Sequence, residues 1–281
     1  MPMARVIANV SAEFGYYDLL GASEKARWKF GELPWNDFDK SKATDGDIYA
    51  ATVSAQGELT TFSATSSFMQ LFSDDIDFMQ WLAIWFYEET RHPLALIKWL
   101  AMAGSPTDET FMRSGREIEP MTKSKVDMLT FNIVSEIMAS VVYQHLSNAA
   151  SEPLLAEITR NISRDEMRHS VGFEYYCRKA IDAAEDPGLE RIRVLRAVWF
   201  LLEPSADGLM RHPVFLALKR VKGVDVDAIK ETVTRQILRR FSKLLDVELE
   251  NSDQLYAVYL RCKREYRSAQ AVQSSGGATR I

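Results

Sequence analysis

Two stretches of sequence, EETRH at 88–92 and DEMRH at 165–169, share one pattern. Each contains Glu-x-x-His, with an acidic residue directly before the Glu and an arginine directly before the His. Side chains at positions i and i+3 lie on the same face of an α-helix, so this Glu and His can bind one metal ion together. The chain has four histidines, and two of them fall in this pattern. The matched copies predict a metal site built on two helices.

Two isolated carboxylates complete such a site. A helical bundle that binds two metals takes one further carboxylate from each of its other two helices. Glu58 is the only acidic residue deep inside the apolar stretch 47–72, and Glu136 holds the same place in the stretch 122–148. Both are therefore predicted ligands.

The spacing of the four glutamates predicts how the helices pair. Glu58 precedes Glu89 by 31 positions, and Glu136 precedes Glu166 by 30 positions. This separation suits half a helix, a tight turn and half a helix back. Antiparallel neighbours then hold their ligands at the same height. We predict two helical hairpins folded against each other.

The charge of this cluster identifies what it binds. Carboxylates and imidazoles enclosed by apolar helices are costly to bury without cations, and two divalent ions cancel four negative charges. Mixed carboxylate and imidazole ligands suit two iron ions, or manganese with iron, better than structural zinc. The predicted metal ligands are Glu58, Glu89, His92, Glu136, Glu166 and His169.

Glu88 and Asp165 directly precede two of the predicted ligands. A metal-binding histidine usually donates its other ring N–H to a carboxylate. We expect each carboxylate to accept from the histidine of the opposite motif, with Asp165 serving His92. The alternative is that both are solvated or paired with Arg91 or Arg168.

Other aromatic and imidazole side chains are harder to assign. Trp28 and Trp35 either extend a hydrogen-bonded relay from the site to the surface or pack in the core. His145 and His212 have no partner in a comparable pattern. We interpret both histidines as structural.

The remaining sequence predicts an all-α protein. Its composition, 47% hydrophobic and 26% charged, is that of an ordinary globular chain. Long helical stretches with short links predict a four-helix bundle with additional N- and C-terminal helices. We expect one helical domain over 1–268, a metal-binding core at about 46–185 and a disordered tail at 269–281. The helices are predicted at 47–72, 76–103, 122–148, 153–184, 189–202, 225–248 and 252–268.

Charge and cysteine usage limit the environment and the partners. The net charge of −5 gives no broad attraction to nucleic acid. The two cysteines, Cys177 and Cys262, imply no disulfide framework. The first residues lack the apolar core of a signal peptide, and the longest apolar run, about 78–87, is too short to span a bilayer. We therefore expect a cytoplasmic protein without a membrane partner.

The C-terminal third carries a cluster of basic residues. Such a surface can dock an acidic carrier protein, although solvated helix faces explain the charges equally well. The cluster comprises Arg211, Lys219, Arg220, Lys222, Arg235, Arg239, Arg240 and Lys243.

At the two motifs the chain resembles the ferritin-like di-iron carboxylate superfamily, and within it the soluble acyl-carrier-protein desaturases. Those enzymes carry Glu-Glu-x-Arg-His and Asp-Glu-x-Arg-His on their second and fourth helices, as residues 88–92 and 165–169 do here. The stretches VDMLTFNIVSEIMASVVYQHL and ITRNISRDEMRHSVGFEYY resemble the third and fourth helices. The resemblance covers about 45–185.

The resemblance implies a ferritin-like bundle, O₂ activation at a reduced di-iron centre, a ferredoxin-type electron donor and a homodimer. Desaturases have a Thr three residues after the third-helix Glu, where this chain has Ala139 followed by Ser140. This departure leaves hydroxylation and N-oxygenation open beside desaturation. The N-oxygenases of the superfamily have an additional His ligand where this chain has Ile162, which argues against that subgroup.

Several functions fit these observations. We favour an O₂-dependent oxidoreductase, a desaturase, hydroxylase or related oxygenase, acting on an acyl or other small organic substrate, free or carrier-bound. One alternative is a ligand-binding oxidase like the small subunit of ribonucleotide reductase, with Tyr87 or Tyr143 near the metals. Others are a non-enzymatic iron-binding protein and a tRNA hydroxylase, the latter disfavoured by the net charge.

Overall fold

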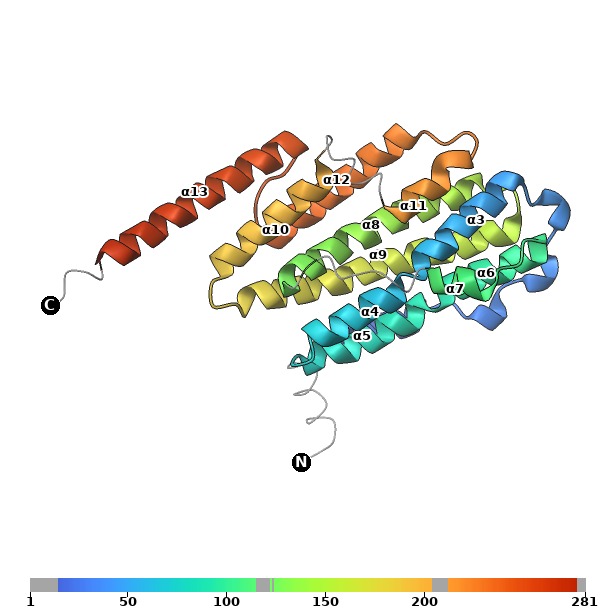
Figure 1. The fold of residues 1–281 in the computed structure, drawn as a ribbon, viewed down its shortest axis with the longest axis horizontal. Coiled ribbons are helices and arrows are strands. Elements are labelled where there is room, and N and C mark those ends of the chain that lie inside the picture. The colour runs from blue at the N-terminus through green and yellow to red at the C-terminus, as the bar shows by residue number, and fades with distance from the viewer. Residues whose placement is uncertain (1–14, 115–121, 123, 204–211, 277–281) are drawn as a thin grey trace, which may run out of the picture.

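The computed structural model describes residues 15–114, 122, 124–203 and 212–276, and all the regular structure in these residues is helical (Figure 1). The all-α prediction is therefore confirmed. Four long segments form the bundle. They are α3 (Asp45–Glu58) with α4 (Thr61–Leu71), α5 (Ile76–Glu89) with α6 (Arg91–Ala103), α8 (Lys125–Ala149), and α9 (Pro153–Asp182).

The segments pair as the two predicted hairpins. In the first, α3 packs against α6 and α4 packs against α5. In the second, α8 packs along the length of α9. The hairpins meet where α5 and α6 contact α9, so side chains from all four segments can converge between them.

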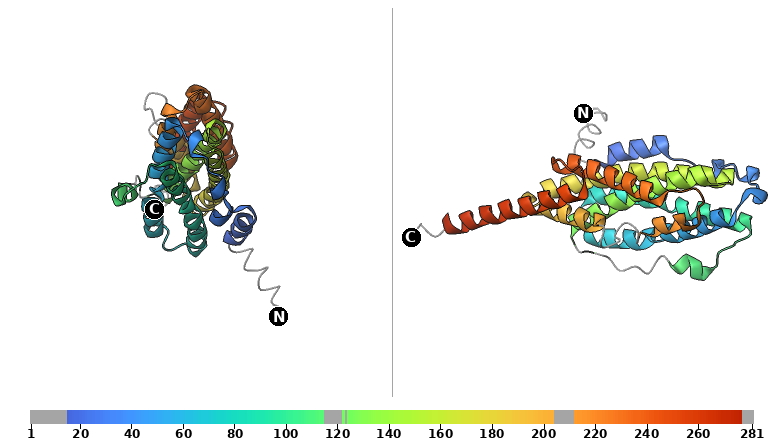
Figure 2. Two further views of the ribbon diagram at one scale, coloured as in Figure 1. Left: turned by 90° about the vertical axis from the view of Figure 1, so that its right-hand side faces the viewer. Right: turned by 90° about the horizontal axis from the view of Figure 1, so that it is seen from above.

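Further helices surround this core. Their bounds are α2 (Tyr16–Ala26), α7 (Glu109–Ser114), α10 (Pro187–Leu202), α11 (Pro213–Leu216), α12 (Val226–Leu245) and α13 (Ser252–Gly276). Short 3₁₀ turns lie at Phe30–Glu32, Trp35–Asp37, Lys40–Lys42 and Ala217–Arg220. Helix α2 packs on α5, and α10 and α12 cover α8. Helix α13 packs on α10 and projects beyond the bundle (Figure 2).

The C-terminal boundary differs from the prediction. Helix α13 continues to Gly276, past the expected end at 268, so residues 269–276 are helical rather than part of a disordered tail. Residues 277–281 lie outside the described part of the chain.

Local sequence explains where the helices begin and end. Asp75 caps α5 by accepting a hydrogen bond from the Phe78 N–H at 3.0 Å. Pro153 occupies the first turn of α9, where its missing N–H costs nothing. Gly104 ends α6 with φ of 91°, a left-handed conformation that favours glycine.

Two predicted helices are each interrupted once, and the prediction of continuous helices was wrong there. The segment 47–72 breaks after Glu58, and the segment 76–103 breaks after Glu89. At the second break Pro93 has no N–H to donate to the carbonyl four residues earlier, which is that of Glu89. At the first break Gly57, a weak helix former, precedes Glu58. Both breaks place a predicted ligand at a helix C-terminus.

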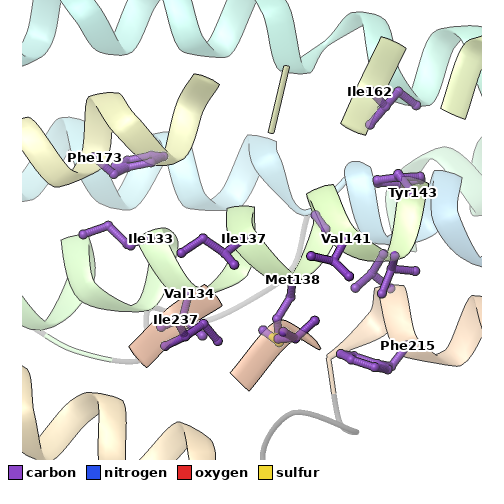
Figure 3. Close-up of a cluster of buried hydrophobic side chains, with 14 of the residues drawn as sticks. Ile133, Val134, Ile137, Met138, Val141, Tyr143, Ile162, Phe173, Phe215 and Ile237 are labelled. Carbon is purple, nitrogen blue, oxygen red and sulfur yellow. The ribbon is translucent and has the colours of Figure 1, made fainter. Parts of the chain in front are cut away.

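Helix α8 forms the centre of the apolar core. Its side chains face α9 on one side and α11 and α12 on the other (Figure 3). The buried set includes Ile133, Val134, Ile137, Met138, Val141, Ile162, Phe173, Phe215 and Ile237. By length and composition α8 is apolar enough to cross a membrane, but 83% of its most apolar window is buried inside the protein, as in a core helix.

Candidate metal centre

All six predicted ligands meet between the two hairpins, and none is more than 8% exposed. Their ligand atoms form two clusters, each with its atoms within 4.8 Å of one another. The first cluster is Glu58, Glu89, His92 and Glu166, and the second is Glu89, Glu136, Glu166 and His169.

Glu89 and Glu166 belong to both clusters. Glu89 Oε1 lies 2.8 Å from His169 Nδ1, and its Oε2 lies 3.7 Å from His92 Nδ1. Glu166 is oriented the other way round. Its Oε1 lies 3.3 Å from His92 Nδ1, and its Oε2 lies 3.7 Å from His169 Nδ1. Each carboxylate therefore turns one oxygen toward each imidazole, which is the placement of a carboxylate that bridges two metal ions.

Glu58 and Glu136 each serve one cluster. Glu58 Oε2 lies 3.3 Å from His92 Nδ1, and Glu136 Oε2 lies 3.6 Å from His169 Nδ1. Ligand atoms about 2.0–2.2 Å from a shared ion lie roughly 3–4 Å from one another, so these separations fit ligands of one ion. The arrangement has two outer carboxylates and two shared ones.

Hydrogen bonds orient three of the four carboxylates. The Tyr143 hydroxyl donates to Glu58 Oε1. The Trp85 ring N–H donates to Glu136 Oε1 at 3.1 Å. The Thr61 hydroxyl donates to Glu89 Oε2 at 3.1 Å. These donors sit on α8, α5 and α4, so the bundle itself fixes the direction of the carboxylates.

Each imidazole also contacts a carboxylate through Nε2, on the side of the ring that faces away from the inner carboxylates. His92 Nε2 lies 3.2 Å from Asp165 Oδ2, and His169 Nε2 lies 2.9 Å from Glu88 Oε2. The expected pairing across the two motifs is present in both cases. An Nε2–H donated to these carboxylates leaves the Nδ1 lone pair of each ring free to bind a metal.

Arg91 and Arg168 neutralise Glu88 and Asp165, the two carboxylates that accept from the imidazoles. Arg168 Nη2 lies 2.8 Å from both Glu88 Oε2 and Asp165 Oδ1, and Arg91 Nη2 lies 3.4 Å from Asp165 Oδ2. Pairing with arginine and with histidine are therefore not alternatives, because the same carboxylates do both. Ser23 also donates to Glu88.

Of the two tryptophans considered for a relay, one joins it. The Trp28 ring N–H donates to Asp165 Oδ2 at 2.8 Å, which links His92, Asp165 and Trp28 in one hydrogen-bonded chain. Trp35 donates instead to the Phe30 carbonyl at 2.9 Å.

The residues fit a pair of divalent cations. Glu89 Oε1, Glu136 Oε2 and His169 Nδ1 are buried without a hydrogen-bond partner, although the first and third lie 2.8 Å apart. Close polar atoms that do not bond to each other are expected when they converge on one ion. Because the two arginines balance Glu88 and Asp165, the four inner carboxylates carry the uncompensated charge of −4 that two divalent ions match.

The electrostatics of the protein without metal agree with this count. Burial, followed by the charge of Glu166, raises the pKa of Glu58 to about 7. Burial and the same neighbour raise the pKa of Glu136 well above its usual range. Burial opposes the charged form of His92 and His169, but the carboxylates around them still raise the pKa of both imidazoles well above the usual range. Protons on these groups therefore balance part of the negative charge in the metal-free protein. Glu58 and Glu89 also end helices α3 and α5, whose C-terminal dipoles favour cations.

A cavity of about 90 Å³ adjoins the cluster. Four of the six predicted ligands line it: Glu58, Glu89, Glu136 and Glu166. The other lining residues are Ser54, Gly57, Thr60, Thr61, Ala64, Trp85, Asn132, Ser135, Ala139, Tyr143, His212 and Val214. Its walls therefore carry many hydroxyl and amide groups.

The cavity contains a residue that the sequence did not indicate. His212 was interpreted as structural, yet it lines the cavity and lies 2.7 Å from the Ser135 hydroxyl through Nε2. The two residues are 77 positions apart, and no helical periodicity links them. Ser140, in contrast, turns away from the cavity and donates to the Ser163 carbonyl at 2.8 Å, so Ala139 is the wall at this point.

Fold and site together define a helical bundle with a buried carboxylate and imidazole cluster suited to two metal ions. The sequence model of the fatty acid desaturase family matches residues 58–196, just under half of the chain, and this span contains all six predicted ligands. That family belongs to the ferritin-like, di-iron class. The match indicates an oxidoreductase and suggests a fatty acid as its substrate. No curated protein matches the chain at significant similarity.

Proposed function

We propose that this protein is a non-haem di-iron, O₂-dependent oxidoreductase: a desaturase, hydroxylase or related oxygenase. The observation that carries the proposal is the pair of overlapping four-ligand clusters that share Glu89 and Glu166. The desaturase match over 58–196 supports the same class of chemistry. Mixed oxygen and nitrogen ligands favour redox-active iron, or manganese with iron.

When bound at these ligands, a reduced metal pair supplies the electrons that activate O₂ for removal of hydrogen from a substrate. The chain supplies the geometry. Asp165 and Glu88 fix the two imidazole rings through Nε2. Trp85 and Thr61 hold Glu136 and Glu89 in place. The burial of all six ligands keeps bulk water away from the reacting atoms.

The electron route and the assembly are parts of the same proposal. The chain His92–Asp165–Trp28 leads from the cluster to a half-buried indole, and Arg91 lies over that indole, 4.8 Å from its ring centre. We propose a ferredoxin-type donor, a cytoplasmic location and a homodimer. Docking of a carrier protein on the basic C-terminal surface is a further proposal, in which Arg211 lies outside the described residues.

Metal content tests the proposal directly. The full-length protein is loaded anaerobically with Fe²⁺, desalted and assayed for iron, and its visible spectrum is followed after O₂ is admitted. We expect about two irons per chain and a new absorption band. His169→Ala is expected to lose at least half of the iron, whereas His145→Ala, which removes a histidine outside the cluster, keeps it. Equal iron in both variants contradicts the proposal.

A second function has one observation in its favour. The Tyr143 hydroxyl donates to the predicted ligand Glu58, whereas the other tyrosine considered, Tyr87, is 56% exposed. A tyrosine in that position suits a radical-storing oxidase like the small subunit of ribonucleotide reductase. Electron paramagnetic resonance after O₂ exposure separates the two functions: a stable tyrosyl signal that Tyr143→Phe abolishes favours the oxidase.

A further inference from the structure

We propose that a line of four aromatic side chains carries single electrons from the protein surface to the metal centre when no substrate is bound. This aromatic path comprises, from the centre outward, Trp85, Trp81, Tyr176 and Tyr175. Its function is protective, because an oxidised centre without a substrate is reduced through the path before it damages its own ligands. The inference rests on the proposed function, whose O₂ chemistry supplies the oxidant.

The inner end of the aromatic path contacts the predicted metal centre. The Trp85 ring N–H donates to Glu136 Oε1 at 3.1 Å. The same indole meets the His169 imidazole edge to face, with the ring centres 6.5 Å apart. One predicted ligand from each of α8 and α9 therefore adjoins the first ring of the path.

Packed rings continue from Trp85 toward the surface. Trp81 precedes Trp85 by four positions on α5, so the two indoles lie on one face of the helix. Phe173 of α9 packs against both, with its ring centre 5.3 Å from that of Trp85 and 4.8 Å from that of Trp81. The Tyr176 ring centre lies 5.2 Å from that of Trp81, and the Tyr175 ring centre lies 4.9 Å from that of Tyr176. The path thus crosses from α5 to α9.

Solvent reaches the aromatic path at its outer end. The three inner rings are at most 4% exposed, whereas Tyr175 is 42% exposed. Among aromatic side chains, tryptophan and tyrosine give up a single electron most readily. The inner rings are therefore shielded from oxidants in solution, and Tyr175 is the ring that can exchange an electron with a small reductant in water.

Asp77 provides the proton acceptor that a buried tyrosine needs, because an oxidised phenol is a strong acid. The Tyr176 hydroxyl donates to Asp77, 3.1 Å from its carbonyl oxygen and 3.3 Å from its carboxylate Oδ1. Lys179 Nζ lies 2.9 Å from the other carboxylate oxygen, Oδ2. Burial and the charge of Asp77 raise the pKa of Tyr176, so the ring is a neutral phenol before it is oxidised.

Electrons and protons balance along the path. Trp85 gives one electron to the oxidised centre and recovers one from Trp81. Trp81 recovers an electron from Tyr176, whose phenolic proton passes to the Asp77 carboxylate. Tyr175 then gives an electron to Tyr176 and its own proton to water, while Asp77 returns the first proton to Tyr176.

A one-electron reductant in solution, a thiolate or an ascorbate-type enediol, completes the sequence. It gives one electron to the oxidised Tyr175, and water returns the proton. The net change is one electron moved from the reductant to the metal centre, with every aromatic side chain restored.

Spin trapping tests the aromatic path in the full-length protein. The protein is loaded with Fe²⁺ and mixed with O₂ and a nitroso spin trap, without a substrate, and peptide mass spectrometry locates the adducts. We expect an adduct on Tyr175 and none on Tyr256. Tyr256 is 41% exposed, close to the value of Tyr175, but it stacks on Trp199 in a separate aromatic cluster between α10 and α13. An oxidant that diffuses through solution would label both tyrosines.

Two variants interrupt the path, and a third is the matched control. Trp81→Phe and Tyr176→Phe each keep an aromatic ring but remove the group that is readily oxidised. Both are expected to lose the adduct on Tyr175 and to accumulate irreversible oxidation of Trp85, which no longer recovers its electron. Trp199→Phe makes the same change as Trp81→Phe outside the path and is expected to leave both readouts unchanged. The melting temperature and iron content are compared for all variants.

The iron content also separates this inference from the proposed function. In protein that has taken up iron, the path alone is contradicted by a missing adduct on Tyr175 or by equal labelling of Tyr175 and Tyr256. An undiminished adduct in both Trp81→Phe and Tyr176→Phe contradicts it as well. Protein that takes up no iron contradicts the proposed function and, with it, the path that depends on that oxidant.

Discussion

His92 and His169 make equivalent contacts with the surrounding carboxylates, although they belong to different hairpins. Each ring turns Nδ1 toward the inner carboxylates and Nε2 toward a carboxylate that precedes the other motif's Glu. Removing that rear acceptor frees the ring to rotate and weakens the basicity of Nδ1.

The first prediction concerns the rear acceptor Asp165. In Asp165→Asn we expect the affinity for one of the two metals to fall about 10- to 100-fold while the fold is retained. Competition with a metallochromic chelator measures the affinity. Asp182→Asn, at the end of the same helix α9, is the matched control. An unchanged affinity in Asp165→Asn would show that the hydrogen bond to His92 does not support metal binding.

The second prediction concerns the raised pKa of Glu58. Its pKa is about 7 in the folded, metal-free protein against an ordinary value of 4.5, so the folded state holds a proton that the unfolded state has lost between these values. The contribution is complete below pH 4.5 and disappears as the pH rises through 7. Glu58→Gln removes this dependence.

Denaturation in the presence of a chelator measures the effect. Between pH 4.5 and 8 we expect the free energy of unfolding of the wild type to fall, relative to Glu58→Gln, by on the order of 3 kcal/mol. Parallel pH profiles for the two proteins would mean that Glu58 is ionised in the metal-free site.

The sequence predicts those parts of the site that follow helical spacing. The six clustered ligands and the roles of Glu88 and Asp165 follow from helical spacing, which is local and periodic. The contact between His212 and Ser135 joins segments 77 positions apart through a loop conformation. The hydrogen bond from Tyr143 to Glu58 depends on how α8 is rotated against α3. Neither contact produces a periodic pattern in the sequence.

At the scale of elements, most helices were predicted within a few residues because their ends carry local signals such as Asp75, Gly104 and Pro153. The break after Glu89 was missed, although Pro93 was visible in the sequence. A proline inside a helix either kinks it or ends it, and the sequence alone did not decide between these two outcomes.

Close packing of α9 on α5 gives the third prediction. A Cβ added at Gly172 would lie 2.3 Å from Trp81 Cζ2, closer than any stable contact. We expect Gly172→Ala to lower the free energy of unfolding by about 1–3 kcal/mol, because the indole must shift within a packed core. Gly21→Ala, in helix α2 with nothing within 4 Å, is expected to be neutral or to stabilise slightly. Chemical denaturation compares them, and similar losses would contradict the packing argument.

At the scale of the whole molecule, the ligands come from both hairpins. Glu58, Glu89 and His92 belong to the first, and Glu136 and Glu166, with His169, to the second. Metals bound by both therefore connect the hairpins and stabilise only the assembled fold.

The fourth prediction follows from that connection. Metal in 1,000-fold excess over its dissociation constant is expected to raise the free energy of unfolding by about 4 kcal/mol and to raise the melting temperature accordingly. Scanning calorimetry with and without a chelator measures both. Glu166→Ala, which removes a ligand shared by the two clusters, is expected to show little of this shift. A full shift in that variant would place the metal elsewhere.

The position of His212 in the chain has a consequence for how such proteins diversify. The ligands all lie within the span 58–196 that matches the desaturase family, whereas His212 and Ser54 approach the cavity from outside it. The predicted metal ligands and part of the cavity wall are thus encoded in separate stretches of sequence. A descendant that kept the ligand pattern but replaced residue 212 would keep the predicted metal centre and change the wall of the cavity beside it.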